Sequence, residues 1–224
     1  MTDSSSLTDE QFAFLDLKPD LEVVLREVHQ GLSLAAKAIS PKFFYDERGS
    51  ELFDAITELP EYYVTRTEMA LFDAHMAEIS ACLEENICVI EYGSGSTKKI
   101  RRLLEVLQPQ AYVPVDISGD YLLSNAEVLL SDFPALKIFP VCADITQSFD
   151  LPSQVEALRP LGFYPGSSIG NFEPTDAVEF LRRVHVTLGT GGYFLVGVDA
   201  KKDVSILEAA YDDAAGVTAQ FNLN

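Results

Sequence analysis

The sequence predicts an α/β fold in which a mostly parallel sheet carries helices on both faces. The first observation is a short, β-branched run over residues 86–91, followed by two closely spaced glycines, Gly93 and Gly95. The second is that helical spacing of apolar residues begins directly after this turn, over residues 100–107. The third is that strand-like and helix-like patterns continue to alternate along the chain, which is typical of a parallel sheet covered on both faces.

The elements after the glycine turn follow in a regular order. Further strands are predicted at residues 111–118, 136–145 and 193–198, and another runs from residue 161 into a loop of small residues. Helices are predicted at residues 119–130 and 174–188, the second starting at Pro174, because proline is favoured at the first helical position. Residues 209–218 are expected to form a helix and a loop over the sheet edge.

The N-terminal part is predicted to be mainly helical. Residues 1–20 are polar and acidic and predict a loosely held arm. Asp20 can cap a helix over residues 21–31 with one apolar face, and Ser50 can cap a short helix after it. An aromatic loop containing Tyr62 and Tyr63 leads into a helix at residues 69–83. One tyrosine of this pair is expected to pack with a satisfied hydroxyl, while the other is free to face a cleft.

The glycine turn differs from the dinucleotide-binding fingerprint. Lys98 occupies the position where that fingerprint has its third glycine, which argues against an NAD-dependent oxidoreductase, although that alternative stays open. A nucleoside ligand without phosphates, such as S-adenosylmethionine, does not require the third glycine. A turn that merely connects two elements is an equally reasonable interpretation of this motif alone.

Polar side chains end the predicted strands, and we expect Glu91, Asp116, Asp144 and Asn171 to line one edge of the sheet. Asp116 follows Gly93 by 23 positions, a spacing suited to an acid that accepts hydrogen bonds from ribose hydroxyls. Asp144 could bind the exocyclic amine of adenine. Both acids could instead cap the segments that follow them. Asn171 lies among small residues, where a ligand can approach.

Composition limits the possible partners. The chain has 224 residues and a formal charge of −19, which argues against a nucleic-acid partner because phosphate backbones call for a basic patch. The three cysteines have no metal or redox spacing, and Cys88 and Cys142 lie in apolar runs, so we expect buried thiols and no metal. No signal peptide or membrane-spanning stretch is visible. We therefore expect a cytoplasmic monomer without a membrane partner.

Several blocks together resemble the histidine-specific, S-adenosylmethionine-dependent methyltransferase family, whose best-known members make trimethylhistidine for ergothioneine biosynthesis. The resemblance extends from about Pro41 to Asn224. It is carried by residues 44–46, 49–53, 59–63, 91–95, 166–171 and 211–218. It implies a Rossmann-like class I methyltransferase fold and an enzyme that methylates the α-amine of a free amino acid, L-histidine, as its small-molecule substrate.

The resemblance also implies a role for individual residues and a division of the chain. Cofactor contacts are assigned to Gly93, Lys99, Asp116, Asp144 and Ile145. Contacts with the substrate amino acid are assigned to Tyr62, Asn171 and Tyr211, and more weakly to Tyr45. We expect residues 1–85 to form a helical arm and a substrate-side segment, and residues 86–224 to form the cofactor-binding core.

Members of the family continue beyond the point that corresponds to Asn224, and that further region carries a glutamate and a serine that hold the substrate imidazole. We therefore expect a C-terminal substrate-binding portion to be absent from these 224 residues. This leaves a second hypothesis open, namely a cofactor-binding module that is non-catalytic or has another specificity.

Overall fold

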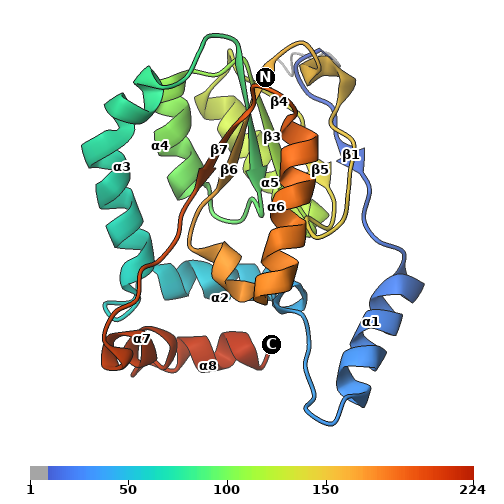
Figure 1. The fold of residues 1–224 in the computed structure, drawn as a ribbon, viewed down its shortest axis with the longest axis vertical. Helices are drawn as coiled ribbons and strands as arrows, with labels where there is room; N and C mark the ends of the chain where they lie inside the picture. The colour runs from blue at the N-terminus through green and yellow to red at the C-terminus, as the bar shows by residue number, and fades with distance from the viewer. Residues whose placement is uncertain (1–9) are drawn as a thin grey trace, which may run out of the picture.

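A seven-stranded parallel sheet forms the centre of residues 10–224, the part of the chain described by the computed structural model (Figure 1). β2 (Ile87–Tyr92) lies between β3 (Ala111–Asp116) and β6 (Arg159–Tyr164). β4 (Lys137–Ile138) and β5 (Val141–Cys142) pair with β3, β1 (Leu15–Asp16) pairs with β5, and β7 (Tyr193–Val196) pairs with β6. The chain thus builds the sheet outward from β2 in both directions. Open α/β sheets bind ligands at such a reversal of strand order.

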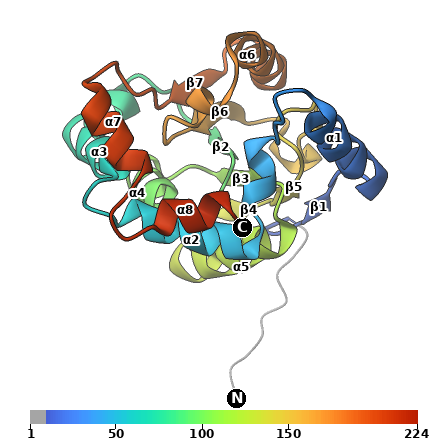
Figure 2. The ribbon, with the colours of Figure 1, turned by 90° about the horizontal axis from the view of Figure 1, so that it is seen from below.

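Helices cover both faces of the sheet, as predicted. α3 (Tyr63–Ala81), α4 (Thr97–Leu107) and α5 (Gly119–Asp132) lie on one face, and α6 (Pro174–Leu188) lies on the other (Figure 2). β2 divides its side chains between them, because alternate residues of a strand point to opposite faces. Val89 packs on the face of α3, α4 and α5, whereas Ile90 packs on the face of α6. α6 begins at Pro174 as expected.

A third layer lies beyond the carboxyl ends of the strands (Figures 1 and 2). It contains α2 (Glu47–Thr57), α7 (Val204–Tyr211) and α8 (Val217–Asn222). Three short 3-10 helices complete the list of elements: η1 (Pro41–Phe44) precedes α2, η2 (Ser153–Val155) precedes β6, and η3 (Ser168–Asn171) follows β6. The apolar side chains of the third layer form a cluster separate from the two sheet faces. We call five aromatic residues of this cluster, whose rings contact one another, the aromatic cap; they are Phe44, Tyr45, Phe53, Tyr62 and Phe221.

Residues 10–20 are not the loose arm that their polarity predicts. β1 adds to the edge of the sheet in parallel with β5, and Phe12 forms an isolated bridge with Ile138. Phe12 and Leu15 pack against the two sheet-face clusters, so the few apolar residues of this segment decide its position. The rest of the predicted arm, residues 1–9, lies outside the described part of the chain.

The third predicted strand, residues 136–145, is divided into β4 and β5. Phe139 and Pro140 separate the two pieces. Proline has no backbone N–H and cannot donate to a neighbouring strand, which accounts for the interruption.

Two helix starts differ from the prediction. Asp46, not Ser50, caps α2, since its carboxylate accepts a 2.7 Å hydrogen bond from the backbone N–H of Gly49. Ser50 lies inside the helix and is buried. α3 begins at Tyr63, six positions before the predicted start at Met69, so the expected aromatic loop is helical from Tyr63 onward. Packing of Val64 in the third cluster explains the earlier start, because it buries the first turn.

α1 (Leu21–Ser33) is capped by Asp20 as predicted, but its apolar face is not buried by the rest of residues 10–224. Leu21 and Leu25 are 68% and 59% exposed. In Figure 1 this helix projects from the body beside the third layer. Within the described residues, no helix combines the length and apolarity needed to cross a bilayer.

Candidate active site

The glycine turn is held on the neighbouring strand and leaves open space above it. Backbone N–H groups of Gly93 and Ser94 donate to the carbonyl of Val115 at 2.8 and 3.0 Å. Gly93 has φ +75°, a conformation that side chains with a Cβ rarely adopt. A Cβ built on Gly93 or Gly95 would meet no atom within 4 Å. The turn therefore presents bare backbone toward the strand edge, as a ligand-binding turn requires.

Glu91 does not line this edge, contrary to the prediction. It is 2% exposed and lies beneath the turn, where it accepts a hydrogen bond from the Tyr112 hydroxyl. That hydroxyl is also 3.0 Å from the Ser94 hydroxyl. Burial raises the pKa of Glu91 to about 7, although the hydrogen bonds from Tyr112 and Ser94 oppose the shift. Glu91 therefore supports the turn from inside and is not available to a ligand.

Asp116 is partly buried at the end of β3 and faces no cation. One carboxylate oxygen accepts a 2.9 Å hydrogen bond from the backbone N–H of Ser118, so the capping role left open by the sequence is real. No described residue forms an ion pair with this carboxylate or donates a side-chain hydrogen bond to it. Burial raises its pKa to about 6, with backbone hydrogen bonds from Ser118 and Ile117 opposing the shift. Donors from a ligand, such as two ribose hydroxyls, would complete its surroundings.

Asp144 is more fully engaged within the protein. Its Oδ1 accepts from the backbone N–H and hydroxyl of Thr146 at 2.8 and 2.7 Å, and its Oδ2 pairs with Lys42 at 2.7 Å. Burial alone would raise the pKa of Asp144, but these partners outweigh it and lower the pKa below its usual value. Lys42 also pairs with Glu27 of α1 at 2.7 Å. Ile145 follows as a half-buried side chain against the face covered by α6.

Three tyrosines predicted to contact the amino acid come together in the third layer. The rings of Tyr62 and Tyr211 are 5.9 Å apart and perpendicular, and Tyr45 packs edge-on against Phe53 and Phe221. The hydroxyls of Tyr45, Tyr62 and Tyr211 have no hydrogen-bond partner within residues 10–224. Burial and then the nearby Asp116 carboxylate raise the pKa of Tyr45 to about 12, which places this phenol on the Asp116 side of the group.

The structure shows which of the adjacent tyrosines, Tyr62 and Tyr63, is packed and which faces a cleft, a choice that the sequence left open. Tyr62 is the packed residue, at 4% exposure, but its hydroxyl is the one without a partner. Tyr63 faces a cleft, yet its hydroxyl donates to Asp199. Asn171 ends η3 in the loop after β6, where it is exposed and has no side-chain hydrogen bond within the described residues. It is therefore free to bind a ligand.

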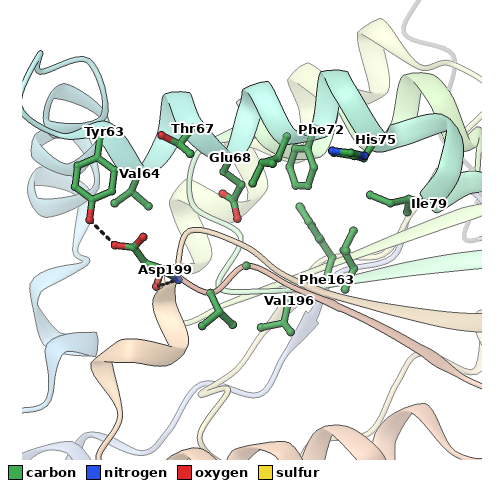
Figure 3. A pocket seen from close by; sticks show the side chains of 15 residues that line it. Tyr63, Val64, Thr67, Glu68, Phe72, His75, Ile79, Phe163, Val196 and Asp199 are labelled. Atoms are coloured by element: carbon green, nitrogen blue, oxygen red, sulfur yellow. Dashed lines mark hydrogen bonds between the residues drawn. The ribbon is translucent and has the colours of Figure 1, made fainter. Parts of the chain in front are cut away.

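The cleft faced by Tyr63 is a groove between α3 and the last two strands (Figure 3). We call it the α3 groove. Apolar side chains such as Phe72, Phe163 and Val196 form most of its wall, and Glu68 and Asp199 are its acids. It runs along the face of α3 and reaches the loop after β6, because Ser167 lines it and Glu68 bonds to Gly166.

Lys99 lies where the resemblance predicts, in the first turns of α4, but an unpredicted residue holds it. Its Nζ is 2.7 Å from the carboxylate of Glu68, and the two side chains are 15% and 11% exposed. A signal for Glu68 was present in the sequence. It falls at four-residue spacing between Val64 and Phe72 on the buried stripe of α3, where an acid needs a partner.

These side chains suit a nucleoside ligand better than a dinucleotide. The turn offers open backbone at Gly93 and Gly95, and Asp116 offers a carboxylate without a cation. Lys98 pairs with Glu58, and Lys99 pairs with Glu68. A pyrophosphate would therefore have to compete with these two carboxylates for the lysines.

Residues 24–224 match the family described as histidine-specific methyltransferase, SAM-dependent. The chain belongs to this family. It is 40% identical over 207 residues to a histidine N-alpha-methyltransferase of Mycolicibacterium smegmatis, covering 91% of this chain and 64% of that protein. It is 39% identical over 205 residues to a histidine N-alpha-methyltransferase of Mycobacterium tuberculosis, covering 89% and 62%. The chain thus spans a little under two thirds of the length of these relatives.

The chain is also similar to a more distant relative and to a solved structure. Ergothioneine biosynthesis protein 1 of Neurospora crassa is 34% identical over 191 residues, which cover 80% of this chain and 21% of that protein. The structure of 1,6-didemethyltoxoflavin-N1-methyltransferase from Burkholderia thailandensis, with bound S-adenosylhomocysteine, has a TM-score of 0.44 and 15% identity, covering 80% of this chain and 82% of that one. The fold of the family, a Rossmann-like methyltransferase sheet, is the one that residues 10–224 adopt.

Proposed function

We propose that this chain carries the cofactor site and part of the amino-acid site of an enzyme that methylates the α-amine of free L-histidine. Family membership and the names of the two mycobacterial relatives support the reaction and the substrate. The observation that carries the proposal is the approach of two groups that lack side-chain partners among residues 10–224. The Asp116 carboxylate faces no described cation, and Tyr45 lies near it and belongs with Tyr62 and Tyr211 to a set of phenols whose hydroxyls have no described partner.

S-adenosylmethionine, when bound, supplies an electrophilic methyl group. We assign its binding to the open turn at Gly93, to Lys99 and Asp116, and to Asp144 and Ile145 on the neighbouring strand end. Asp144 would take a ligand donor in addition to its present partners, Lys42 and Thr146.

The amino acid is assigned to Tyr62, Asn171 and Tyr211, with Tyr45 as a further contact. A phenol or carboxamide can hold an α-amine or α-carboxylate by hydrogen bonds, and fixing the amine in line with the methyl group supplies much of a rate gain. Closure of the aromatic cap over the site would also exclude water.

No side chain is assigned as a general base. The three histidines, at positions 29, 75 and 185, are exposed and lie on α1, α3 and α6, away from the strand edge. The α-amine of a free amino acid is largely protonated near neutral pH, because its pKa is about 7.7–8.0 even in model peptides and the neighbouring carboxylate raises it further, so the amine must lose a proton to water before it reacts. The residues around the amine therefore need only select its neutral form and orient it.

The predicted division at residue 85 is part of this proposal. The segment before it would supply Tyr45 and Tyr62 from the aromatic cap, while the segment after it would hold the cofactor. Tyr211 and Asn171 come from the second segment, so the amino-acid site would draw on both.

The test is mass spectrometry of L-histidine incubated with this chain and S-adenosylmethionine, beside a panel of the other amino acids. We expect histidine to gain up to three methyl groups and the other amino acids to remain unchanged. Binding of S-adenosylhomocysteine without methyl transfer to any amino acid would instead support the cofactor-binding module. A nicotinamide cofactor that binds in place of S-adenosylhomocysteine would contradict both hypotheses.

A further inference from the structure

Glu68 is a buried acid that bonds to two different parts of the candidate site. Its carboxylate pairs with Lys99 Nζ at 2.7 Å. The same carboxylate accepts from the backbone N–H of Gly166, at 2.9 Å to one oxygen and 3.0 Å to the other. In Figure 3 the side chain points from α3 toward the strands that carry Phe163 and Val196. One side chain of α3 thus reaches both the cofactor side and the loop after β6.

The loop held by Glu68 has an unusual backbone. Gly166 has φ +80° and Ser167 has φ +58°, so two successive residues take left-handed conformations, one of them without glycine's freedom. A second anchor follows, because the Ser167 hydroxyl accepts a 2.9 Å hydrogen bond from the backbone N–H of Asp199. The loop then continues through η3 to Asn171. Its shape therefore depends on these two contacts.

The surroundings leave Glu68 little room to move. A Cβ at Gly197 would overlap its Oε1, and a Cβ at Gly166 would lie 3.0 Å from Lys99 Nζ. Glycines at both positions allow the backbone to approach the ion pair closely. The ammonium, the carboxylate and the loop backbone form one contiguous unit on four elements, namely α3, α4, the β6 loop and the end of β7.

Stability gives little reason for such an arrangement. A buried ion pair contributes little net stability compared with apolar residues of the same volume, because both charges lose their hydration. The stripe of α3 that contains Glu68 is otherwise apolar, with Val64, Phe72 and Met76 all buried. A purely structural stripe would place another apolar side chain at this position.

We propose that Glu68 is a positioning residue that couples the cofactor site to the amino-acid site. It fixes Lys99 on one side and the loop that ends in Asn171 on the other. A ligand that fixes the position of Lys99 therefore also stabilises the binding conformation of the loop. By thermodynamic reciprocity, a ligand bound at the loop raises the affinity at Lys99 by the same factor. This inference depends on the proposed function, because the two ligands it couples are those of the methyl transfer.

The measurement is the dissociation constant of S-adenosylhomocysteine by calorimetry, without and with saturating L-histidine. In the unmodified chain we expect histidine to tighten binding about tenfold, within the usual range of coupling between sites. Glu68→Gln keeps the shape and one acceptor for Gly166 but cannot neutralise Lys99. Glu68→Gln should therefore lower the ratio of the dissociation constant without histidine to that with histidine, from about ten toward one. Glu68→Asp keeps the charge on a shorter side chain and should give an intermediate ratio.

Glu78→Gln is the matched control, because Glu78 lies on the same helix, is 78% exposed and has His75, at 3.5 Å, as its ion-pair partner among the described residues. It should keep the full ratio. A merely structural role of Glu68 would lower the melting temperature and weaken both constants equally, leaving the ratio unchanged. If Glu68→Gln does not fold, the ratio measured with Glu68→Asp decides.

The outcomes separate this inference from the proposed function. A full ratio in Glu68→Gln, or in Glu68→Asp where only that variant folds, overturns the coupling role. A ratio of one in the unmodified chain also overturns it and leaves the proposed function standing. If the unmodified chain does not bind S-adenosylhomocysteine, both the coupling role of Glu68 and the proposed function are wrong.

Discussion

The two halves of the candidate site are built in different ways. Apart from Lys99 on α4, the residues of the cofactor half lie at or just after the ends of β2, β3 and β5 in the central sheet. The amino-acid half draws Tyr45, Tyr62 and Tyr211 from separate segments of the chain. Tyr62 packs directly against Tyr211, and the ring of Phe53 joins Tyr62 to Tyr45. The first half inherits its geometry from backbone pairing, whereas the second depends on side-chain packing. The amino-acid half should therefore be easier to disrupt without loss of the sheet.

The largest expected effect is on the aromatic cap. Phe221 is 8% exposed and touches the rings of Phe44, Tyr45 and Phe53. Phe221→Ala should cost about 3–5 kcal/mol of unfolding free energy in the cap, because it leaves a cavity among these rings. Urea unfolding should show this loss, and calorimetry should show histidine affinity falling far more than S-adenosylhomocysteine affinity. Leu223→Ala, at a position 87% exposed, is the control and should change neither.

The next effect falls on the cofactor half. Asp116→Asn should weaken S-adenosylhomocysteine binding about 10- to 100-fold, the usual cost of losing hydrogen bonds to a charged group. Because the folded pKa of Asp116 is raised to about 6 from 3.8, the unmodified chain should lose stability relative to the variant as the pH rises from about 4 to 6. That loss is at most about 3 kcal/mol. Equal cofactor affinity in both proteins would remove Asp116 from the site.

The next prediction concerns the ion pair by which Lys42, in the N-terminal segment, holds Asp144 of the cofactor half. Lys42→Met removes the partner that lowers the Asp144 pKa, and should destabilise the fold by about 1–3 kcal/mol near neutral pH. A carboxylate with a lowered folded pKa stabilises above its unfolded pKa and loses this contribution as the pH falls. The difference between the two proteins in unfolding experiments should therefore shrink as the pH falls below the usual Asp144 pKa of 3.8, and vanish below the lowered folded pKa. Lys201→Met, at an exposed position, should show no such difference.

Asn171 tests the amino-acid half without disturbing the cap. Its side chain is exposed and unbonded within residues 10–224, so Asn171→Ala should leave stability within about 0.5 kcal/mol. Histidine affinity should fall about tenfold, corresponding to one lost hydrogen bond. Affinity for S-adenosylhomocysteine alone should stay the same. Equal losses for both ligands in calorimetry would contradict the role of Asn171.

The smallest effect is expected from removing one oxygen atom. The Tyr62 hydroxyl has no partner within the described residues, so Tyr62→Phe should keep or slightly raise the melting temperature. It should nevertheless weaken histidine binding severalfold. A matched change, Tyr63→Phe, removes a hydroxyl that donates to Asp199 and should lower the melting temperature instead. The reverse pattern would show that the two tyrosines have exchanged roles.

Local sequence determined much of the sheet and of the cofactor half. Apolar runs, a glycine pair and the helical spacing after it are short-range patterns, and hydrogen bonding between parallel strands then brings Gly93 and Asp116 to one edge. Errors arose where a distant contact outweighed local composition. Residues 15 and 16 became a strand because β5 offered a free edge, and Glu91 turned inward because Tyr112 gave its carboxylate a donor.

The sequence by itself determined the fold class, the position of the glycine turn and the acids that end the strands, because each depends on residues close together in the chain. Tertiary structure alone decided which tyrosine hydroxyls are free, that Lys42 binds Asp144, and that Glu68 joins Lys99 to the loop at Gly166. Those partners are separated by tens of residues. Packing of whole helices on the sheet brings them together, and no local pattern specifies it.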